Sequence, residues 1–116
     1  MRIPGARVLD AQRWIRTHLR QATVAGSTKA VGVSSDHLAR LFKAARKYGP
    51  RHAIAQARVD CAKEILCSTN HSLHEIATTL AGMRKLRRTI ESEEHIPVLQ
   101  GLVADVRTYP ELEQDI

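Results

Sequence analysis

Basic side chains gather at helical spacing between residues 34 and 51, and their chemistry suits a nucleic acid. Residues 34–47 read S-S-D-H-L-A-R-L-F-K-A-A-R-K, an apolar stripe with polar positions between its members. An arginine on such a helix can bind guanine through O6 and N7, which discriminates between bases by about 1–3 kcal/mol. The sequence predicts contact with double-stranded DNA through Ser35, Asp36, His37, Ala39, Arg40, Lys43, Arg46, Lys47 and Arg51.

The expected roles differ along this set. The side expected to face base edges carries His37, Ala39, Arg40 and Lys43, with Asp36 at its N-terminal edge. The residues expected to touch phosphates, which position a protein without specifying sequence, are Arg46, Lys47 and Arg51. The alternative is that Arg40 is a structural surface residue paired with Asp36, because side chains at i and i+4 adjoin on a helix.

A second basic cluster predicts a second DNA contact. It consists of Arg84, Lys85, Arg87 and Arg88. Three glutamates follow it, at positions 91, 93 and 94. A solvated face, or ion pairs between these arginines and the glutamates, is therefore the alternative interpretation.

No constellation in the sequence supports catalysis. The chain contains no G-x-S-x-G, no glycine-rich phosphate loop and no H-E-x-x-H. Cys67, His71 and His74 could suggest a metal, but a helix break lies among them and no fourth ligand is evident. We therefore expect no enzymatic activity, no cofactor and no bound metal.

The distribution of charge favours a polyanionic partner. The net charge is +6, and residues 1–63 hold 13 Lys and Arg against 3 Asp and Glu, whereas residues 64–116 hold 5 against 9. Such a basic half favours nucleic acid first and an anionic membrane surface second, with a solvated basic face as the alternative. The four aromatic residues, Trp14, Phe42, Tyr48 and Tyr109, are too scattered to stack the bases of single-stranded nucleic acid.

Hydropathy and cysteine usage point to a cytoplasmic protein. No run of about 18 apolar residues is present, so we expect no membrane span. Cys61 and Cys67 lie six residues apart in an expected helix and point to different faces, so they cannot bond to each other. We expect both to be small, semi-buried core residues.

Helical periodicity runs through the chain, which predicts an all-α fold. A first helix-turn-helix subdomain is expected over residues 1–49. Its helices cover 6–20, a short and poor segment at 24–31, and 34–47. Gly32 would end the second helix and Ser34 would cap the third, whereas Ser27 falls where a core residue is wanted.

The remaining residues predict a linker helix and a second subdomain. Pro50 suits the first turn of a long linker helix over 50–67. The second subdomain, 68–107, would begin with the capping box Ser72-Leu73-His74-Glu75. Its expected helices run from Leu73 until Gly82, over 83–94, and from Pro97 to Arg107. The acidic tail at 108–116 is expected to be loose.

Several motifs resemble one family. Residues 32–43, G-V-S-S-D-H-L-A-R-L-F-K, are similar to the segment G-hydrophobic-S-x-x-x-L-x-R-x-F-K, and residues 72–77, S-L-H-E-I-A, to S-I-x-E-I-A. Both belong to the DNA-binding domain of the AraC/XylS family of bacterial transcription regulators. The matching linker-helix positions are Pro50, Arg58, Ala62 and Leu66. The resemblance covers about residues 8–103.

The resemblance implies a sequence-specific, DNA-binding transcription regulator. Two helix-turn-helix subdomains would present Arg40 and Arg88, at matching positions, to successive major grooves on one side of the duplex. Arg20 and Arg58 are further candidates for phosphate contacts. RNA polymerase or another regulator would be a second partner, and no small-molecule ligand is expected.

The second subdomain departs from the family pattern. Leu86 and Ile90 replace two usual phenylalanines, Glu94 replaces a buried aromatic, and the turn after Leu80 is a couple of residues short. In the first subdomain, the family usually has a glycine near Lys47. The alternative function is therefore a regulatory interaction protein that binds another transcription factor or RNA polymerase, as antagonist or co-regulator, rather than DNA.

Overall fold

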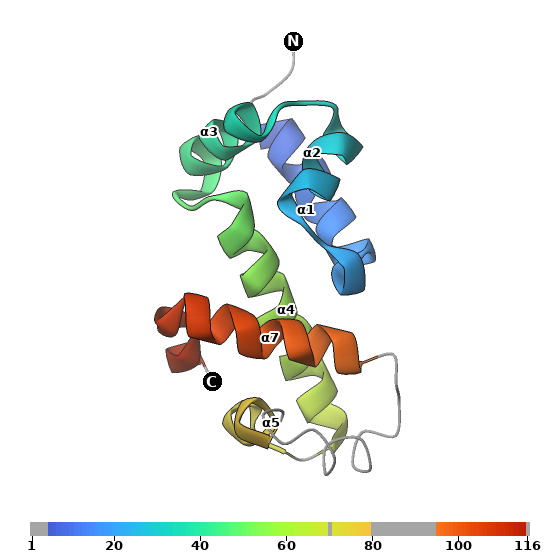
Figure 1. Cartoon of the computed structure of the whole chain (residues 1–116), viewed down its shortest axis with the longest axis vertical. Helices are drawn as coiled ribbons and strands as arrows, with labels where there is room; N and C mark the ends of the chain where they lie inside the picture. Colours follow the sequence, from blue (N-terminus) through green and yellow to red (C-terminus); the bar gives the residue numbers. More distant parts are fainter. Residues whose placement is uncertain (1–4, 70, 80–94, 116) are drawn as a thin grey trace. The chain divides into compact units, whose positions relative to one another are not determined.

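The computed structural model describes residues 5–69, 71–79 and 95–115, and every regular element in these ranges is helical. The elements are α1 Gly5–Thr17, η1 Leu19–Gln21, α2 Val24–Val31, α3 Ser35–Arg46, α4 Pro50–Thr69, α5 Leu73–Thr79, α7 Ile96–Thr108 and η2 Pro110–Asp115 (Figure 1). The all-α prediction is confirmed. The chain divides into two compact units, Met1–Ala57 (unit 1) and Arg58–Ile116 (unit 2), and the boundary falls inside α4.

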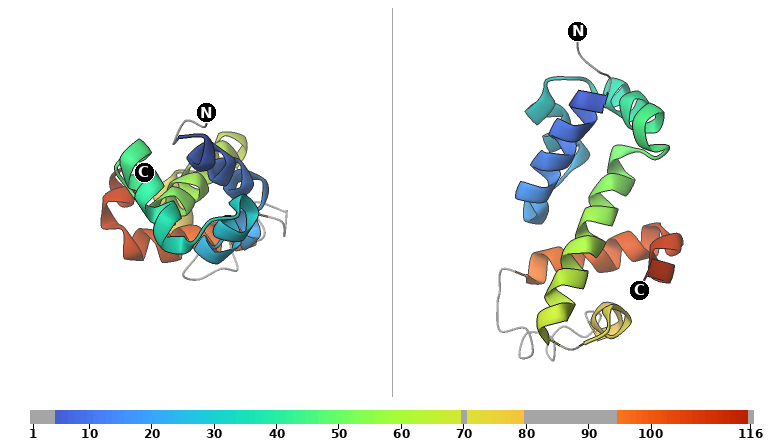
Figure 2. Two further views of the ribbon diagram at one scale, coloured as in Figure 1. Left: turned by 90° about the horizontal axis from the view of Figure 1, so that it is seen from above. Right: turned by 180° about the vertical axis from the view of Figure 1, so that it is seen from behind.

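Unit 1 is built on one apolar core that α1, α2 and α3 share with the first turns of α4 (Figures 1 and 2). The buried members of this core are Val8, Ala11, Ile15, Ala22, Leu38, Phe42, Ala53 and Ile54. Their spacing of three and four residues within α1 and α3 gives each helix one buried face. The periodicity of the sequence predicted these faces correctly.

The helix α2 forms despite its weak composition, because its polar groups are satisfied locally. The Thr23 side chain caps the helix by accepting a hydrogen bond from the Gly26 backbone N–H, at 2.9 Å. Ser27 is fully buried, and its hydroxyl donates to the Val24 carbonyl at 2.7 Å. A serine therefore serves at a core position without leaving a buried donor unpaired. Gly32 ends α2 in the left-handed conformation, with φ of 72°.

The indole of Trp14 holds α1 and α2 close together. A Cβ atom built on Gly26 would lie 2.5 Å from Cη2 of Trp14 and 3.0 Å from Oγ1 of Thr23. Only glycine leaves room for the ring at this point. The ring of His18, four residues after Trp14, stacks on the indole, with the two ring centroids 4.9 Å apart.

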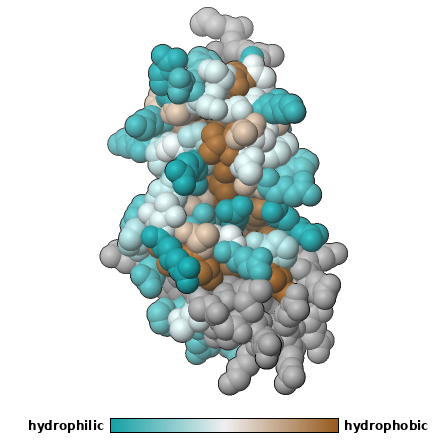
Figure 3. Space-filling model, in the orientation of Figure 1, coloured by the Kyte–Doolittle hydropathy of each residue, from teal (hydrophilic) through white to brown (hydrophobic). Residues whose placement is uncertain are grey.

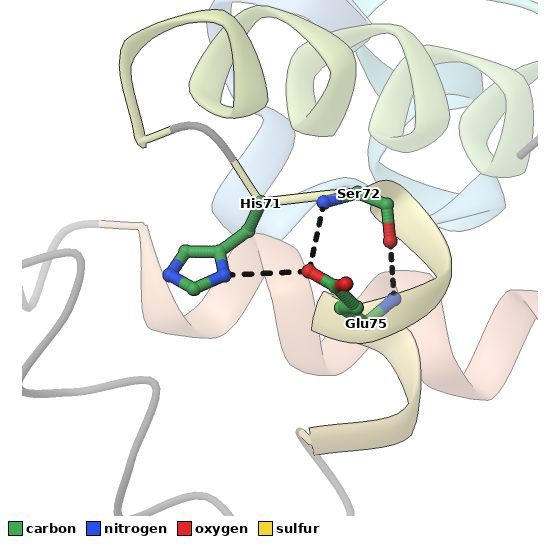
Figure 4. A network of polar contacts seen from close by, with 3 residues as sticks. All are labelled: His71, Ser72 and Glu75. Atoms are coloured by element: carbon green, nitrogen blue, oxygen red, sulfur yellow. Dashed lines mark hydrogen bonds and ion pairs between the residues drawn. The ribbon is translucent and has the colours of Figure 1, made fainter.

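Unit 2 places α7 against α5 and η2. Its buried apolar residues are Val59, Ala62, Ile65, Ile76, Ile96, Val98, Leu99, Leu102 and Leu112. The capping box predicted at the start of α5 is present: the Glu75 backbone N–H donates to the Ser72 hydroxyl, and the Ser72 N–H donates to the Glu75 carboxylate (Figure 4). His71 adds a 3.4 Å contact to the same carboxylate.

Arg58 has a structural position in unit 2, which corrects the expectation that it contacts phosphate. Its guanidinium forms a 3.1 Å ion pair with Asp105, and each side chain is only 15% exposed. The arginine crosses α7 at Gly101, where an added Cβ would lie 2.6 Å from Nε of Arg58. The guanidinium of Arg58 therefore joins α4 to α7 within unit 2.

The acidic tail is ordered, in contrast to the expected loose segment. Residues 110–115 form the 3₁₀ helix η2, and Leu112 is only 2% exposed. The tail folds back because one apolar side chain in it can enter the core of unit 2. The helix expected over 83–94 lies outside the described residues. Within the described ranges, no helix has the length and apolarity needed to cross a membrane.

The packing of Trp14 predicts the effect of enlarging Gly26. Gly26→Ala is expected to lower the free energy of unfolding of unit 1 by about 1–3 kcal/mol, since overpacking outweighs the higher helix propensity of alanine. Trp14 is the one tryptophan in the sequence, so its fluorescence in a urea titration reports on unit 1. Gly49→Ala is the control, because nothing lies within 4 Å of a Cβ there. An unchanged midpoint for Gly26→Ala would contradict the packing described above.

The two cysteines differ in environment. Both are free thiols, Cys61 half-buried as expected and Cys67 exposed, in contrast to the expectation. Burial raises the pKa of the Cys61 thiol, and the nearby carboxylate of Glu64 raises it further. At pH 8 the thiolate fraction of Cys61 is thereby reduced.

Because the thiolate is the nucleophile, iodoacetamide is expected to modify Cys67 several-fold faster than Cys61. Mass spectrometry of peptides sampled over time at pH 8 would measure both rates in one reaction. Glu64→Gln is expected to accelerate the modification of Cys61. Equal rates at the two thiols in the native chain would show that the environment of Cys61 is not as described.

Candidate nucleic-acid interface

The rotation of α3 about its axis is set by its buried residues. Leu38 and Phe42 are both fully excluded from solvent in the core of unit 1. At 3.6 residues per turn, the opposite side of the helix then carries positions spaced i, i+4 and i+7, which are Asp36, Arg40 and Lys43. Lys47 follows them at the C-cap. All four residues are exposed, and we call them the outer face of α3.

Both ends of α3 are defined by caps, which fix the length of the outer face. The Ser34 side chain accepts from the His37 backbone N–H at 3.2 Å, as expected for an N-cap. Only three residues, 32–34, separate α2 from α3, which is the length of a helix-turn-helix connection. At the other end, the Lys47 N–H donates to the Lys43 carbonyl at 3.0 Å and closes the helix.

Lys47 closes α3 in a conformation that favours glycine. Its φ is 67° and its ψ is 11°. Among the described residues, no other non-glycine residue has a positive φ. A side chain in this left-handed region costs free energy relative to glycine. The AraC/XylS pattern usually has a glycine near this position, and the positive φ of Lys47 shows why glycine would suit it.

The structure distributes the predicted contact residues over three sides of α3. The outer face receives Asp36, Arg40, Lys43 and Lys47. His37 is exposed on one flank, and the other flank carries Ser35, half-buried Ala39 and Arg46. Arg51 is exposed in the first turn of α4, within unit 1. The cluster Arg84, Lys85, Arg87 and Arg88 lies outside the described residues.

The cations of the outer face are available to a ligand. The side chains of Arg40 and Lys43 make no hydrogen bond or ion pair with any described residue, and no ion pair joins Arg40 to Asp36. The alternative of a structural Arg40–Asp36 pair is therefore absent from this structure. Arg46 is partly engaged, since it donates to its neighbour Ala45 at 3.3 Å and to Gln12 of α1 at 3.5 Å.

Two positioning contacts were not predicted from the sequence. Arg7 is half-buried and donates to the Val31 carbonyl at the C-terminal end of α2, where a cation suits the helix dipole. The side-chain carbonyl of Gln12 in α1 accepts a hydrogen bond from Arg46 in α3. Both join helices distant in sequence, and no local pattern marks such contacts.

A second basic surface lies on α1. Leu9, Arg13 and Arg16 follow the spacing i, i+4 and i+7 on the side opposite to the core, and all three are exposed, Leu9 at 49%. Because α1 and α3 bury their inner faces in one core, their outer faces point away from it in different directions. Figure 3 shows hydrophilic residues along the edges of unit 1, with hydrophobic surface in the band between α3 and the α1–α2 pair.

No metal-binding cluster is formed by the parts of the chain that the structure describes. Of the three residues considered for a metal, His71 is held by the Glu75 carboxylate, which also completes the capping box (Figure 4). The imidazole of His71 therefore has a local structural role at the start of α5.

Comparison with known proteins gives one partial similarity. The chain is similar to Endonuclease MutS2 from Synechocystis sp., with 58% identity over 48 residues, which is 41% of this chain and 6% of that protein. The chain thus spans a small part of the length of the curated relative that it matches. No family model and no solved structure matches the chain.

Glycine is expected to change stability in opposite directions at Lys47, the C-cap of α3, and at Lys43, inside the helix. Lys47→Gly is expected to raise the free energy of unfolding of unit 1 by up to about 1 kcal/mol, since glycine adopts positive φ without a steric cost. Lys43→Gly, the same exchange inside the helix, should lower it by about 1 kcal/mol. Urea titrations followed by Trp14 fluorescence would measure both, and destabilisation by Lys47→Gly would contradict the left-handed cap.

Proposed function

We propose that this chain is a DNA-binding transcription regulator of the AraC/XylS type that acts through the outer face of α3. The observation that carries the proposal is that face itself: exposed, unpaired Arg40 and Lys43 with Lys47 beyond them, on the second helix of a helix-turn-helix. In this arrangement the second helix enters the major groove and offers its side chains to base edges. The proposed ligand is double-stranded DNA.

The proposed contacts divide into two classes. Arg40 is the candidate to bind guanine, because its guanidinium can donate two parallel hydrogen bonds to O6 and N7. Lys47 and Arg51 lie near the end of α3 and the start of α4, where phosphate contacts would fix the register of the helix. Arg46 can join them by leaving its 3.5 Å contact with Gln12.

Charge and similarity add independent support for a nucleic-acid partner. The 13 Lys and Arg among residues 1–63 provide the positive field that steers proteins to DNA. The partial relative is named an endonuclease, which is an enzyme class that cleaves nucleic acids. We propose a binding role rather than cleavage for this chain, because its sequence offers no catalytic constellation.

The test is binding to random-sequence duplex DNA, measured by fluorescence anisotropy across a salt series. The logarithm of affinity should fall with the logarithm of salt concentration, with a slope near −0.9 for each phosphate neutralised. Arg40→Ala should weaken binding at every salt concentration. Arg13→Ala is the matched control, because it removes another exposed arginine, on α1 and away from the outer face of α3. Arg88→Ala tests the second basic cluster in the same way.

The outcomes separate the candidate functions. Loss of affinity through Arg40→Ala but not Arg13→Ala supports contact by α3. Equal loss through both would indicate unspecific attraction by net charge. Absence of binding at low salt, with the chain folded, would overturn the proposal.

An interaction protein is the second candidate function, and the outer surface of α1 favours it. Arg13 and Arg16 follow the exposed side chain of Leu9 along the same side of α1. A mixed basic and apolar surface suits a protein partner with acidic and apolar side chains, such as another regulator or RNA polymerase. This function would be preferred if the chain bound no DNA.

A further inference from the structure

Asp36 occupies an unexpected place for a carboxylate. It is exposed on the outer face of α3, one turn before Arg40, and its carboxylate has neither a hydrogen bond nor an ion pair with the described residues. If this face meets DNA, as proposed above, the carboxylate enters the field of a polyanion. Every phosphate repels it, so a favourable contact requires a hydrogen-bond donor on a base.

The major groove offers few donors to a carboxylate. Guanine presents the acceptors O6 and N7, and thymine presents the acceptor O4 beside a methyl group. Adenine presents the N6 amine directly beside the acceptor N7. Cytosine alone presents an amine, at N4, with no acceptor next to it. An acidic side chain is therefore matched best by cytosine, because each of the other bases presents an acceptor that repels its lone pairs.

We propose that Asp36 makes the outer face of α3 prefer cytosine close to the guanine that Arg40 binds. This inference rests on the proposed function. Four residues of α-helix rise by about 6 Å, and successive base pairs are about 3.4 Å apart. The cytosine is thus expected within about two base pairs of the guanine, on either strand.

A structural role of Asp36 makes a different prediction. An acidic residue in the first turn of α3 also stabilises the helix through its dipole. That role affects the free energy of unfolding but has no effect on which base is preferred. Base preference is therefore the readout that separates specificity from helix stabilisation.

The experiment selects duplexes with a randomised central segment, using the whole chain, and sequences the bound fraction. The native chain should enrich cytosine near guanine by about fivefold or more. Asp36→Ala should remove this preference. Asp36→Asn should shift it toward adenine, because an amide can accept from N6 and donate to N7. Asp10→Asn is the matched control, since Asp10 is an exposed acid on α1 and its loss changes the net charge equally.

Three results are decisive. Loss or shift of the cytosine preference in the Asp36 variants, with Asp10→Asn unchanged, supports the inference. If Arg40→Ala removes the guanine preference while the Asp36 variants select the same bases as the native chain, the inference is wrong and the proposed function stands. If the native chain shows no salt-dependent binding to any duplex in the anisotropy series, both are overturned.

Discussion

The burial of Leu38 and Phe42 fixes everything that α3 presents to solvent. A helix can rotate about its own axis at little cost until one of its faces is removed from water. Here both side chains enter the core that α1 and α4 share, and each is fully buried. The rotation that buries them turns Asp36 and Arg40 outward. The candidate interface is therefore a consequence of apolar packing on the other side of the helix.

The arginines of the chain fall into structural and available groups, and net charge does not distinguish them. Arg7 donates to the carbonyl that ends α2, and Arg58 pairs with Asp105 inside unit 2. The guanidinium groups of both residues donate to protein acceptors in place of water. Arg40 and Arg13 remain exposed and unpaired among the described residues, so their charge can attract a ligand. The net charge of +6 therefore does not show which cations are exposed and unpaired.

The helix α2 shows how unit 1 retains a weak element. Its residues have low helix propensity, yet it supplies one wall of the core and the turn that leads into α3. Two local hydrogen bonds and one tertiary contact hold it: the Thr23 cap, the bond from Ser27 to the Val24 carbonyl, and the close approach of Trp14 to Gly26. Tertiary packing compensates for propensity here, as is common for short helices.

The helical class, the positions of the caps and the polar outer face of α3 could all be predicted from the order of residues. Ser34, the Ser72–Glu75 capping box and Pro50 lie where they were predicted, because each acts on backbone groups within four residues. Which cations are free, and that the acidic tail folds around Leu112, became evident only from the three-dimensional packing. These features depend on contacts between segments far apart in the chain, as from Arg58 to Asp105, and a periodicity that spans one helix carries no information about its neighbours.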